Sequence, residues 1–184
     1  WDIVHTFYGA FGFKLRVRIS KHDPLKPESY LGDKDNWALA EGILEGIAKE
    51  KGADSFEGIG EAAFYGPKLD FMAKDALGRE WQVATIQLDM NMPERFDLTC
   101  VNEKGEKERI VMIHAAIMGS IERFMSILIE HTGGNFPLWL ALEQIRIMPV
   151  FDAHPEYAKH ALDALLDIVI RATISDSTFS LCKS

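Results

Sequence analysis

The sequence has only two cysteines in 184 residues, Cys100 and Cys182, and they lack the paired spacing of a zinc ribbon. A disulfide framework is therefore not indicated, and we expect a reducing cytoplasm as the setting. No apolar run approaches the roughly 20 residues that a membrane-spanning helix needs, and no basic segment followed by an apolar one opens the chain. We therefore expect a soluble protein with no membrane partner.

Basic charge is also scarce, since 20 Lys and Arg residues stand against 28 Asp and Glu and the formal net charge is −8. A general phosphate-binding surface needs a high local density of Lys and Arg, so any RNA contact must be local or lie outside these residues. The composition is 47% apolar, which suffices for one sizeable core and the beginning of a second domain. Because the chain opens at Trp1 and stops at Ser184 soon after a strand-like segment, we expect an excerpt of a longer protein.

Antiparallel strands are expected to dominate the middle of the chain. Apolar and polar residues alternate with a period of two in five segments, 11–20, 68–72, 80–88, 96–101 and 109–113. Turn-forming residues at 75–78 and 102–106 join the last four segments into two hairpins.

Two helices accompany these strands. The first begins at Asp33 or Asp35 and ends at Gly52. Its apolar stripe is formed by Trp37, Ala40, Ile43, Leu44 and Ile47. The second has one apolar face over residues 117–129 and stops at Gly133. Both are therefore expected to bury one side.

The pattern changes near Ala141 from antiparallel hairpins to strand, helix and strand. The expected elements are a strand over 144–150, a helix over 154–166 and a strand over 167–174. This order is typical of the start of an α/β unit, so we place a domain boundary there and divide the chain into residues 1–143 and 144–184.

Tyr65 and Lys68 flank a Gly-Pro bend that precedes a predicted strand, and the bend can aim both side chains into a cleft. In one interpretation, Tyr65 hydrogen-bonds a small polar ligand and Lys68 meets a negatively charged group. In the other, the segment is a turn with a solvated lysine.

Gln82 and Gln87 are amides in an otherwise apolar strand. They either read a ligand on the floor of a sheet or occupy its solvated face. Strict alternation places them on opposite faces, so both reach one ligand only if a bulge, a strand end or strong twist intervenes.

His114 and Arg123 lie on either side of the start of the second predicted helix. A neutral imidazole at His114 can bind a metal, but no second His or Cys stands at a local chelating spacing, and a hydrogen-bonded core histidine is the alternative. Arg123, beside Gly119 and Ser120, suits phosphate binding together with backbone N–H groups, or a salt bridge with a nearby acid.

Seven blocks match a known pattern in order and spacing over roughly residues 7–150. They are 63–71, 75–82, 85–89, 93–98, 112–114, 119–124 and 136–141. In this order they resemble threonyl-tRNA synthetases. The sequence departs from the commoner pattern at Val83, Ala84 and Ala115, where many members have cysteine, glycine and arginine.

The resemblance implies an α+β fold, a class II synthetase-type antiparallel β-sheet flanked by helices, followed by the beginning of an α/β anticodon-binding domain. It implies a threonine–tRNA ligase that activates threonine with ATP and Mg²⁺ and then charges tRNA(Thr), as a homodimer in the cytoplasm. The alternatives are a non-catalytic synthetase-like module that binds RNA or protein, and a class II synthetase of prolyl or seryl type.

The resemblance also assigns residues to the ATP and amino-acid pocket. Arg123 corresponds to the arginine of the third class-defining motif, expected against the triphosphate, and Lys68, Gln82 and Gln87 correspond to positions lining the adenylate pocket. Tyr65 corresponds to a residue near the substrate amino group. Lys68 and Arg123 are the expected catalytic residues.

His114 corresponds to one of three protein ligands of a catalytic Zn²⁺ that holds the amino and hydroxyl groups of threonine. The other two ligands, a cysteine and a histidine, are expected before Trp1, as is the arginine of the second motif. On this reading, the 184 residues alone are inactive.

Overall fold

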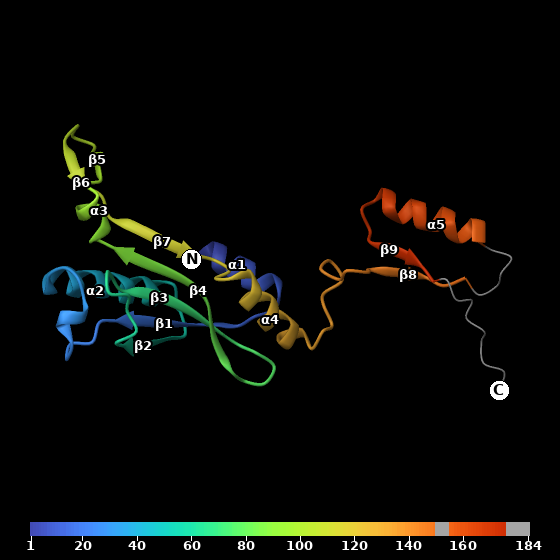
Figure 1. Cartoon of the computed structure of the whole chain (residues 1–184), viewed down its shortest axis with the longest axis horizontal. Coiled ribbons are helices and arrows are strands. Elements are labelled where there is room, and N and C mark those ends of the chain that lie inside the picture. The colour runs from blue at the N-terminus through green and yellow to red at the C-terminus, as the bar shows by residue number, and fades with distance from the viewer. Residues whose placement is uncertain (150–154, 176–184) are drawn as a thin grey trace. The chain divides into compact units, whose positions relative to one another are not determined.

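The computed structural model describes residues 1–149 and 155–175, which belong to two compact units, Trp1–Gly133 and Gly134–Ser184 (Figure 1). The first unit therefore ends ten residues short of residue 143, where we placed the domain boundary. The assignment of residues 1–143 and 144–184 to two domains stays a prediction. Among the described residues, no helix is long and apolar enough to cross a membrane.

The first unit is built on a five-stranded sheet with the order β2-β1-β3-β4-β7. Its strands are β1 (Leu15–Lys21), β2 (Ser55–Ile59), β3 (Lys68–Lys74), β4 (Glu80–Asp89) and β7 (Met112–Ala116), beside the small hairpin of β5 (Thr99–Val101) and β6 (Lys107–Arg109). Its helices are α1 (Asp2–Ala10), α2 (Lys34–Glu50), α3 (Met92–Arg95) and α4 (Ile121–Thr132), with a 3-10 turn η1 (Pro27–Ser29). Only β1 and β2 pair in parallel, and the other three pairs in the sheet are antiparallel. The predicted α+β class is confirmed.

The strands predicted at 68–72 and 80–88 are confirmed as β3 and β4, and the strand predicted at 11–20 is confirmed as β1 except at its start, since β1 begins at Leu15. The second hairpin is shorter than predicted. Its ladder stops at Arg109, and β7 instead pairs with β4. All residues of the three-residue strands β5 and β6 are exposed, whereas pairing with β4 gives β7 a ladder beside the core. As a result His114 lies in the middle of β7, not at the end of a hairpin strand.

Helix α2 begins as predicted, because the Asp33 carboxylate accepts a hydrogen bond of 2.9 Å from the Asn36 backbone N–H. Its buried residues differ from the predicted stripe, since Ile43 is 48% exposed, Ile47 is only half-buried, and Ala48 is buried although it was not predicted. The buried face therefore follows a narrower line along the helix than the apolar residues suggest.

Helix α4 begins at Ile121, four residues later than the apolar pattern indicates. The Ser120 side chain accepts a hydrogen bond of 3.2 Å from the Arg123 backbone N–H and so caps the helix. At the other end, Gly133 takes the left-handed conformation with φ 59°, which ends the helix as predicted.

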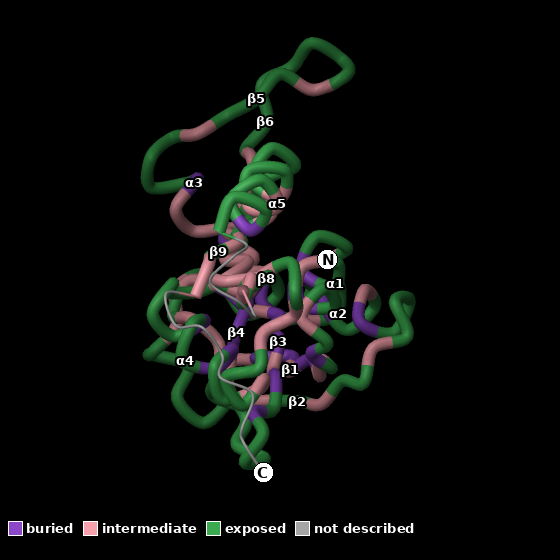
Figure 2. Tube along the Cα trace, turned by 90° about the vertical axis from the view of Figure 1, so that its right-hand side faces the viewer, coloured by how far each residue is buried: buried purple, intermediate pink, exposed green. Residues whose placement is uncertain are grey.

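Helix α1 and strand β2 were not predicted, although α1 covers part of the core. The Tyr8 hydroxyl donates a hydrogen bond of 2.8 Å to the backbone oxygen of Val83 in β4. Rings of α1 also contact Phe71 of β3 and Phe124 of α4. Phe71 is fully buried, and Figure 2 shows the buried segments concentrated along the central strands. One face of the sheet is thus apolar and covered.

The second unit forms a strand, helix and strand, as predicted. β8 (Ile145–Ile147) pairs in parallel with β9 (Ala172–Ile174), and α5 (Pro155–Asp167) connects them. The predicted strand over 167–174 is limited to β9, because α5 continues to Asp167 and Val169 has a positive φ of 63°. The predicted ends at Val150 and His154 lie outside the described residues.

Candidate functional site

A row of polar residues crosses four strands of the sheet in register. Ser20 of β1 lies opposite Lys68 of β3, Lys68 opposite Gln87 of β4, and Gln87 opposite His114 of β7. Directly paired residues point to the same face with Cβ atoms about 5 Å apart. The row therefore presents a hydroxyl, an amine, an amide and an imidazole on the face of the sheet opposite Leu69 and the apolar core.

A second row of paired residues lies on the same face, two residues along each strand from the first row. Arg18, Asp70, Thr85 and Ala116 face one another across the same four strands. Residues two apart in a strand share a face, so this row adds an arginine, a carboxylate and a hydroxyl to the same surface.

A β-bulge at Val83 brings Gln82 to this surface. Phe71 pairs with Ala84, whereas the next residue, Met72, pairs with Gln82, so Val83 is the additional residue in β4. The bulge reverses the alternation, and Gln82 therefore shares a face with Thr85 and Gln87. Strict alternation would place Gln82 and Gln87 on opposite faces of the sheet. The β-bulge places both on the same face.

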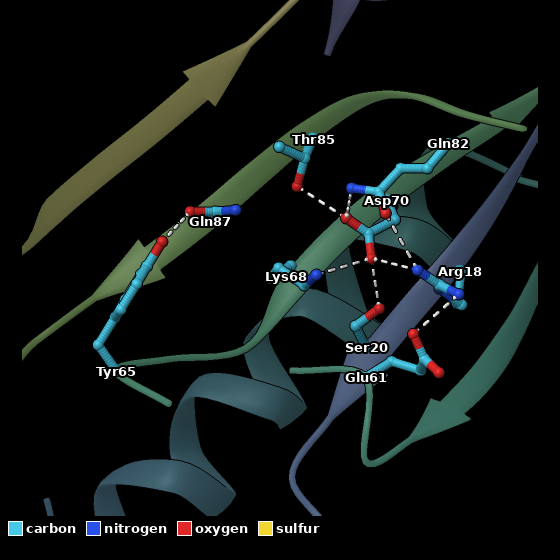
Figure 3. A network of polar contacts seen from close by, with 9 residues as sticks. All are labelled: Arg18, Ser20, Glu61, Tyr65, Lys68, Asp70, Gln82, Thr85 and Gln87. Atoms are coloured by element: carbon cyan, nitrogen blue, oxygen red, sulfur yellow. Dashed lines mark hydrogen bonds and ion pairs between the residues drawn. The ribbon is translucent and has the colours of Figure 1, made fainter. Parts of the chain in front are cut away.

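Asp70 lies at the centre of a polar cluster and is 0% exposed (Figure 3). Its Oδ2 accepts hydrogen bonds or ion pairs from Arg18 Nη2 at 3.0 Å, Ser20 Oγ at 2.6 Å and Lys68 Nζ at 3.2 Å. Its Oδ1 accepts hydrogen bonds from Gln82 Nε2 and Thr85 Oγ1, each at 2.8 Å. The side chain of Lys68 is only 13% exposed, so it is not a solvated lysine of a turn.

Arg18 extends the cluster toward solvent. Its Nη1 lies 3.1 Å from Glu61 Oε2, while its Nη2 also donates to Gln82 Oε1 at 3.2 Å. Two cations, Arg18 and Lys68, are therefore balanced by two carboxylates, Asp70 and Glu61, within one connected network.

Tyr65 lies against the first row at Gln87 and His114. Its hydroxyl donates a hydrogen bond to Gln87 Oε1 (Figure 3). Its ring centroid lies 5.8 Å from that of His114. Burial raises the pKa of the Tyr65 phenol, and the negative charge of Asp89 raises it further. The phenol therefore stays protonated at neutral pH, with oxygen lone pairs that can accept a hydrogen bond from a ligand.

The backbone around Tyr65 is held on both sides. Asn91 Nδ2 donates a hydrogen bond of 2.7 Å to the Tyr65 backbone oxygen. The Leu88 N–H donates to the Pro67 backbone oxygen at 3.1 Å. Gly66 lies so close to β4 that a Cβ atom there would be 1.7 Å from the Leu88 oxygen. The turn thus aims Tyr65 at Gln87 through backbone contacts that tolerate no side chain at residue 66.

His114 pairs with a buried carboxylate at the edge of the sheet. Its Nε2 lies 3.0 Å from Asp89 Oδ2, and the Asp89 side chain is 1% exposed. A metal-binding histidine commonly directs its second ring nitrogen at such a carboxylate, so His114 fits the role of a single ligand with Nδ1 left for the metal. The described residues contain no group of three or more His, Cys, Asp or Glu side chains arranged for a metal, so a complete zinc site is not formed by them.

Arg123 lies in the first turn of α4 and is exposed. Within the part of the chain that the structure describes, its guanidinium forms no ion pair. Glu130, an acid close enough in sequence to pair with it, places its Oε2 3.8 Å from Arg79 Nη2. A Cβ atom on Gly119 would lie 3.3 Å from the backbone oxygen of Val83, so the segment before α4 runs against the bulge. The structure thus gathers Tyr65, Lys68, Gln82, Gln87 and His114 on one face, and it places Arg123 on a neighbouring element without joining it to their hydrogen-bond network.

Sequence reasoning missed the residues that connect this network, Arg18, Asp70 and Asp89. The sequence did carry a signal for Asp70, which lies between the apolar residues Leu69 and Phe71 in a predicted strand. A carboxylate buried at such a position requires hydrogen-bond or ion-pair partners.

The sequence comparisons identify the family of the chain. Residues 1–132 match the family model for the tRNA synthetase class II core domain (G, H, P, S and T). The threonine–tRNA ligase of Flavobacterium johnsoniae is 49% identical over 183 residues, which cover 99% of this chain and 28% of that protein. The ligase of Synechococcus elongatus is 47% identical over 183 residues, with 99% and 30% covered. The chain thus spans less than a third of the length of these curated relatives.

A solved structure gives the same result for the fold. The crystal structure of the RNA-binding domain of threonyl-tRNA synthetase from Cryptosporidium parvum superimposes with a TM-score of 0.85 and 35% sequence identity, covering 96% of this chain and 44% of that one.

Proposed function

The chain belongs to the class II tRNA synthetase core-domain family, and on this premise we propose that it is part of a threonine–tRNA ligase, carrying half of the catalytic core and the start of the anticodon-binding domain. The observation that carries the proposal is the in-register row of Lys68, Gln87 and His114, with Tyr65 hydrogen-bonded to Gln87. The 49% identity to a threonine–tRNA ligase over nearly the whole chain supports the choice of amino acid.

The proposed reaction has two steps and needs no covalent bond to the protein. The threonine carboxylate attacks the α-phosphate of Mg²⁺-bound ATP, which forms threonyl-adenylate and releases pyrophosphate. A ribose hydroxyl at the 3′ end of tRNA(Thr) then attacks the threonyl carbonyl carbon and releases AMP. The protein contributes by positioning the reactants and stabilising developing charge.

Lys68, Gln82 and Arg123 are the proposed nucleotide contacts. Lys68 lies in a cluster that is balanced in charge, with its side chain on the polar face, and Gln82 is held beside it by the Val83 bulge. Arg123 has no acid as a partner among the described residues, so its guanidinium is available to offset phosphate charge in the pentacovalent transition state.

Tyr65 is the proposed contact to the threonine amino group, and Gln87, which accepts its hydrogen bond, is a proposed lining residue of the adenylate pocket. The Tyr65 hydroxyl gives its proton to Gln87 and retains lone pairs that accept a hydrogen bond from an ammonium group. Its raised pKa keeps the phenol neutral, so this contact persists through the physiological pH range.

His114 is the proposed ligand of a Zn²⁺, whose other protein ligands would come from residues outside this chain. A bound zinc would coordinate the amino and hydroxyl groups of threonine and so reject valine, because a methyl group cannot replace a hydroxyl as a ligand. The Asp89 carboxylate, buried behind the ring, would hold the imidazole in its orientation. A homodimer in the cytoplasm completes the proposal.

The test is threonine-dependent ATP–pyrophosphate exchange by the full-length protein, measured beside its zinc content and with valine as the competing substrate. His114→Ala is compared with His160→Ala, which replaces an exposed histidine of α5. We expect one zinc per protomer, exchange with threonine only, and loss of both in His114→Ala but not in His160→Ala. A zinc-free protein without exchange would favour a non-catalytic synthetase-like binding module.

A further inference from the structure

We propose that Asp70 is the positioning residue of the nucleotide site, acting through Lys68 and Gln82 without touching the substrate. The inference rests on the proposed function of this site, and it assigns a role to a residue outside the set that the family resemblance supplies. Both side chains that it holds are proposed nucleotide contacts, and they approach its carboxylate from two different strands (Figure 3).

The coordination of Asp70 is complete. Three donors meet Oδ2 and two meet Oδ1, at distances between 2.6 and 3.2 Å. A carboxylate with this many partners has one orientation, so each donor is fixed in turn. Lys68 has four rotatable side-chain bonds, and its ion pair with Asp70 is the contact that holds its amine against the sheet.

The charge balance shows why a carboxylate is needed. Arg18 and Lys68 both direct cationic groups at Asp70 Oδ2, so a neutral side chain at residue 70 would leave two like charges close together. Lys68 would also lose the acceptor that holds its amine, so the amine would leave the position from which it faces a phosphate even where Arg18 no longer repels it.

Stability alone does not account for the cluster. Buried ion pairs can often be replaced by packed apolar residues without loss of stability, and the opposite face of the same strands is packed in that way by Leu69 and Phe71. Asp75 provides a contrast. It is also a buried acid with several hydrogen bonds, but its partners are Leu77, Arg79 and Trp81 of its own hairpin. We therefore infer that the polar cluster around Asp70 serves to position Lys68 and Gln82 on the face that carries Tyr65 and Gln87.

The experiment measures the dissociation constant for Mg²⁺–ATP and the KM values for ATP and threonine in the full-length protein. Asp70→Asn is compared with Asp75→Asn, the same substitution at a buried acid outside the site. We expect Asp70→Asn to raise the ATP constants by about tenfold or more and to leave the KM for threonine within about twofold, since a displaced contact weakens only the substrate it meets. Asp75→Asn should lower the melting temperature and leave the ATP constants unchanged.

A double variant tests whether Asp70 holds Lys68 directly or only offsets the charge of Arg18. It also provides a second measurement if Asp70→Asn alone misfolds. Arg18→Gln combined with Asp70→Asn leaves Lys68 and Glu61 as a neutral pair, so the two cations no longer repel each other. If Asp70 positions Lys68, the double variant still binds ATP weakly, and adding Lys68→Met causes little further loss. If ATP binding returns to normal, Asp70 serves only to balance Arg18 and the inference is overturned.

Direct ATP binding distinguishes this inference from the proposed function. A full-length protein that binds ATP but does not exchange pyrophosphate with threonine contradicts the ligase assignment, while the Asp70 variants still show whether the nucleotide contacts depend on Asp70. Equal ATP affinity in Asp70→Asn and the unaltered protein would overturn the inference in either case.

Discussion

Gly66 and Leu88 meet backbone to backbone, with no space between them for a side chain. A Cβ atom on Gly66 would lie 1.7 Å from the Leu88 oxygen, far inside van der Waals contact. Because the obstacle is main chain of β4, it cannot rotate away, and any residue larger than glycine must displace the turn that carries Tyr65.

Gly66→Ala is therefore expected to destabilise the protein by about 1–3 kcal/mol, the range for an overpacked core position, and to break the hydrogen bond between Tyr65 and Gln87. Chemical denaturation gives the first quantity, and the KM for threonine in the exchange assay reports the second. Gly46→Ala is the control, because a Cβ atom there meets nothing within 4 Å and the site is helical. It should stabilise the protein by about 0.5–1 kcal/mol. Similar behaviour of the two variants would contradict the proposed close contact.

Tyr65→Phe removes the hydroxyl and keeps the ring. We expect a loss of about 1 kcal/mol of stability, the usual net value of one hydrogen bond, with a larger effect on the KM for threonine than on that for ATP. Tyr30→Phe is the control, since the Tyr30 ring contacts His22 and Trp37, which are not members of the polar row. A variant at residue 65 with an unchanged KM for threonine would remove Tyr65 from the amino-acid site.

Strands β1, β3 and β4 could be predicted because alternation persists where one face of the sheet is buried, as it does from Leu69 to Phe71. The bulge at Val83 could not, since it depends on how β4 pairs with β3 and on the hydroxyl that Tyr8 donates to the Val83 oxygen from a distant helix. The sequence therefore predicted the candidate ligand residues one by one, but it did not predict the hydrogen-bond network that joins them.

The central residue of that network illustrates the limit. Asp70 reads as one polar position in a strand, and its five partners come from three strands that only the register brings together. The end of the second hairpin was predicted wrongly for a related reason. Residues 112–116 pair with β4 and do not extend the hairpin, and this pairing joins segments far apart in the sequence.

Asp75 gives a prediction for pH dependence. Burial by itself would raise the pKa of its carboxyl, but hydrogen bonds from Trp81, Arg79 and the backbone lower the pKa from 3.8 to about 2. A folded-state pKa below the unfolded value stabilises the protein above pH 3.8, and this contribution disappears as the pH falls toward 2.

The difference in unfolding free energy between the unaltered protein and Asp75→Asn should therefore be largest near neutral pH and shrink as the pH falls through this range. Urea denaturation at several pH values measures it. A difference that stays constant down to pH 2 would mean that the Asp75 carboxylate is not stabilised by its hydrogen bonds.

Arg123 separates catalysis from stability more cleanly than any other candidate. It is exposed, its guanidinium has no ion pair in the part of the chain that the structure describes, and its backbone N–H donates to the Ser120 cap of α4 whatever the side chain at residue 123. Arg123→Ala should therefore change the free energy of unfolding by no more than about 0.5 kcal/mol, as surface substitutions usually do. The same variant should slow pyrophosphate exchange by about 10²-fold or more, because the proposed role of Arg123 is to offset charge in the transition state. Glu122→Ala, the exposed neighbour in the same turn, should affect neither quantity. A variant at residue 123 with full activity would show that Arg123 does not act on the phosphates, and a large loss of stability would show that its role is structural.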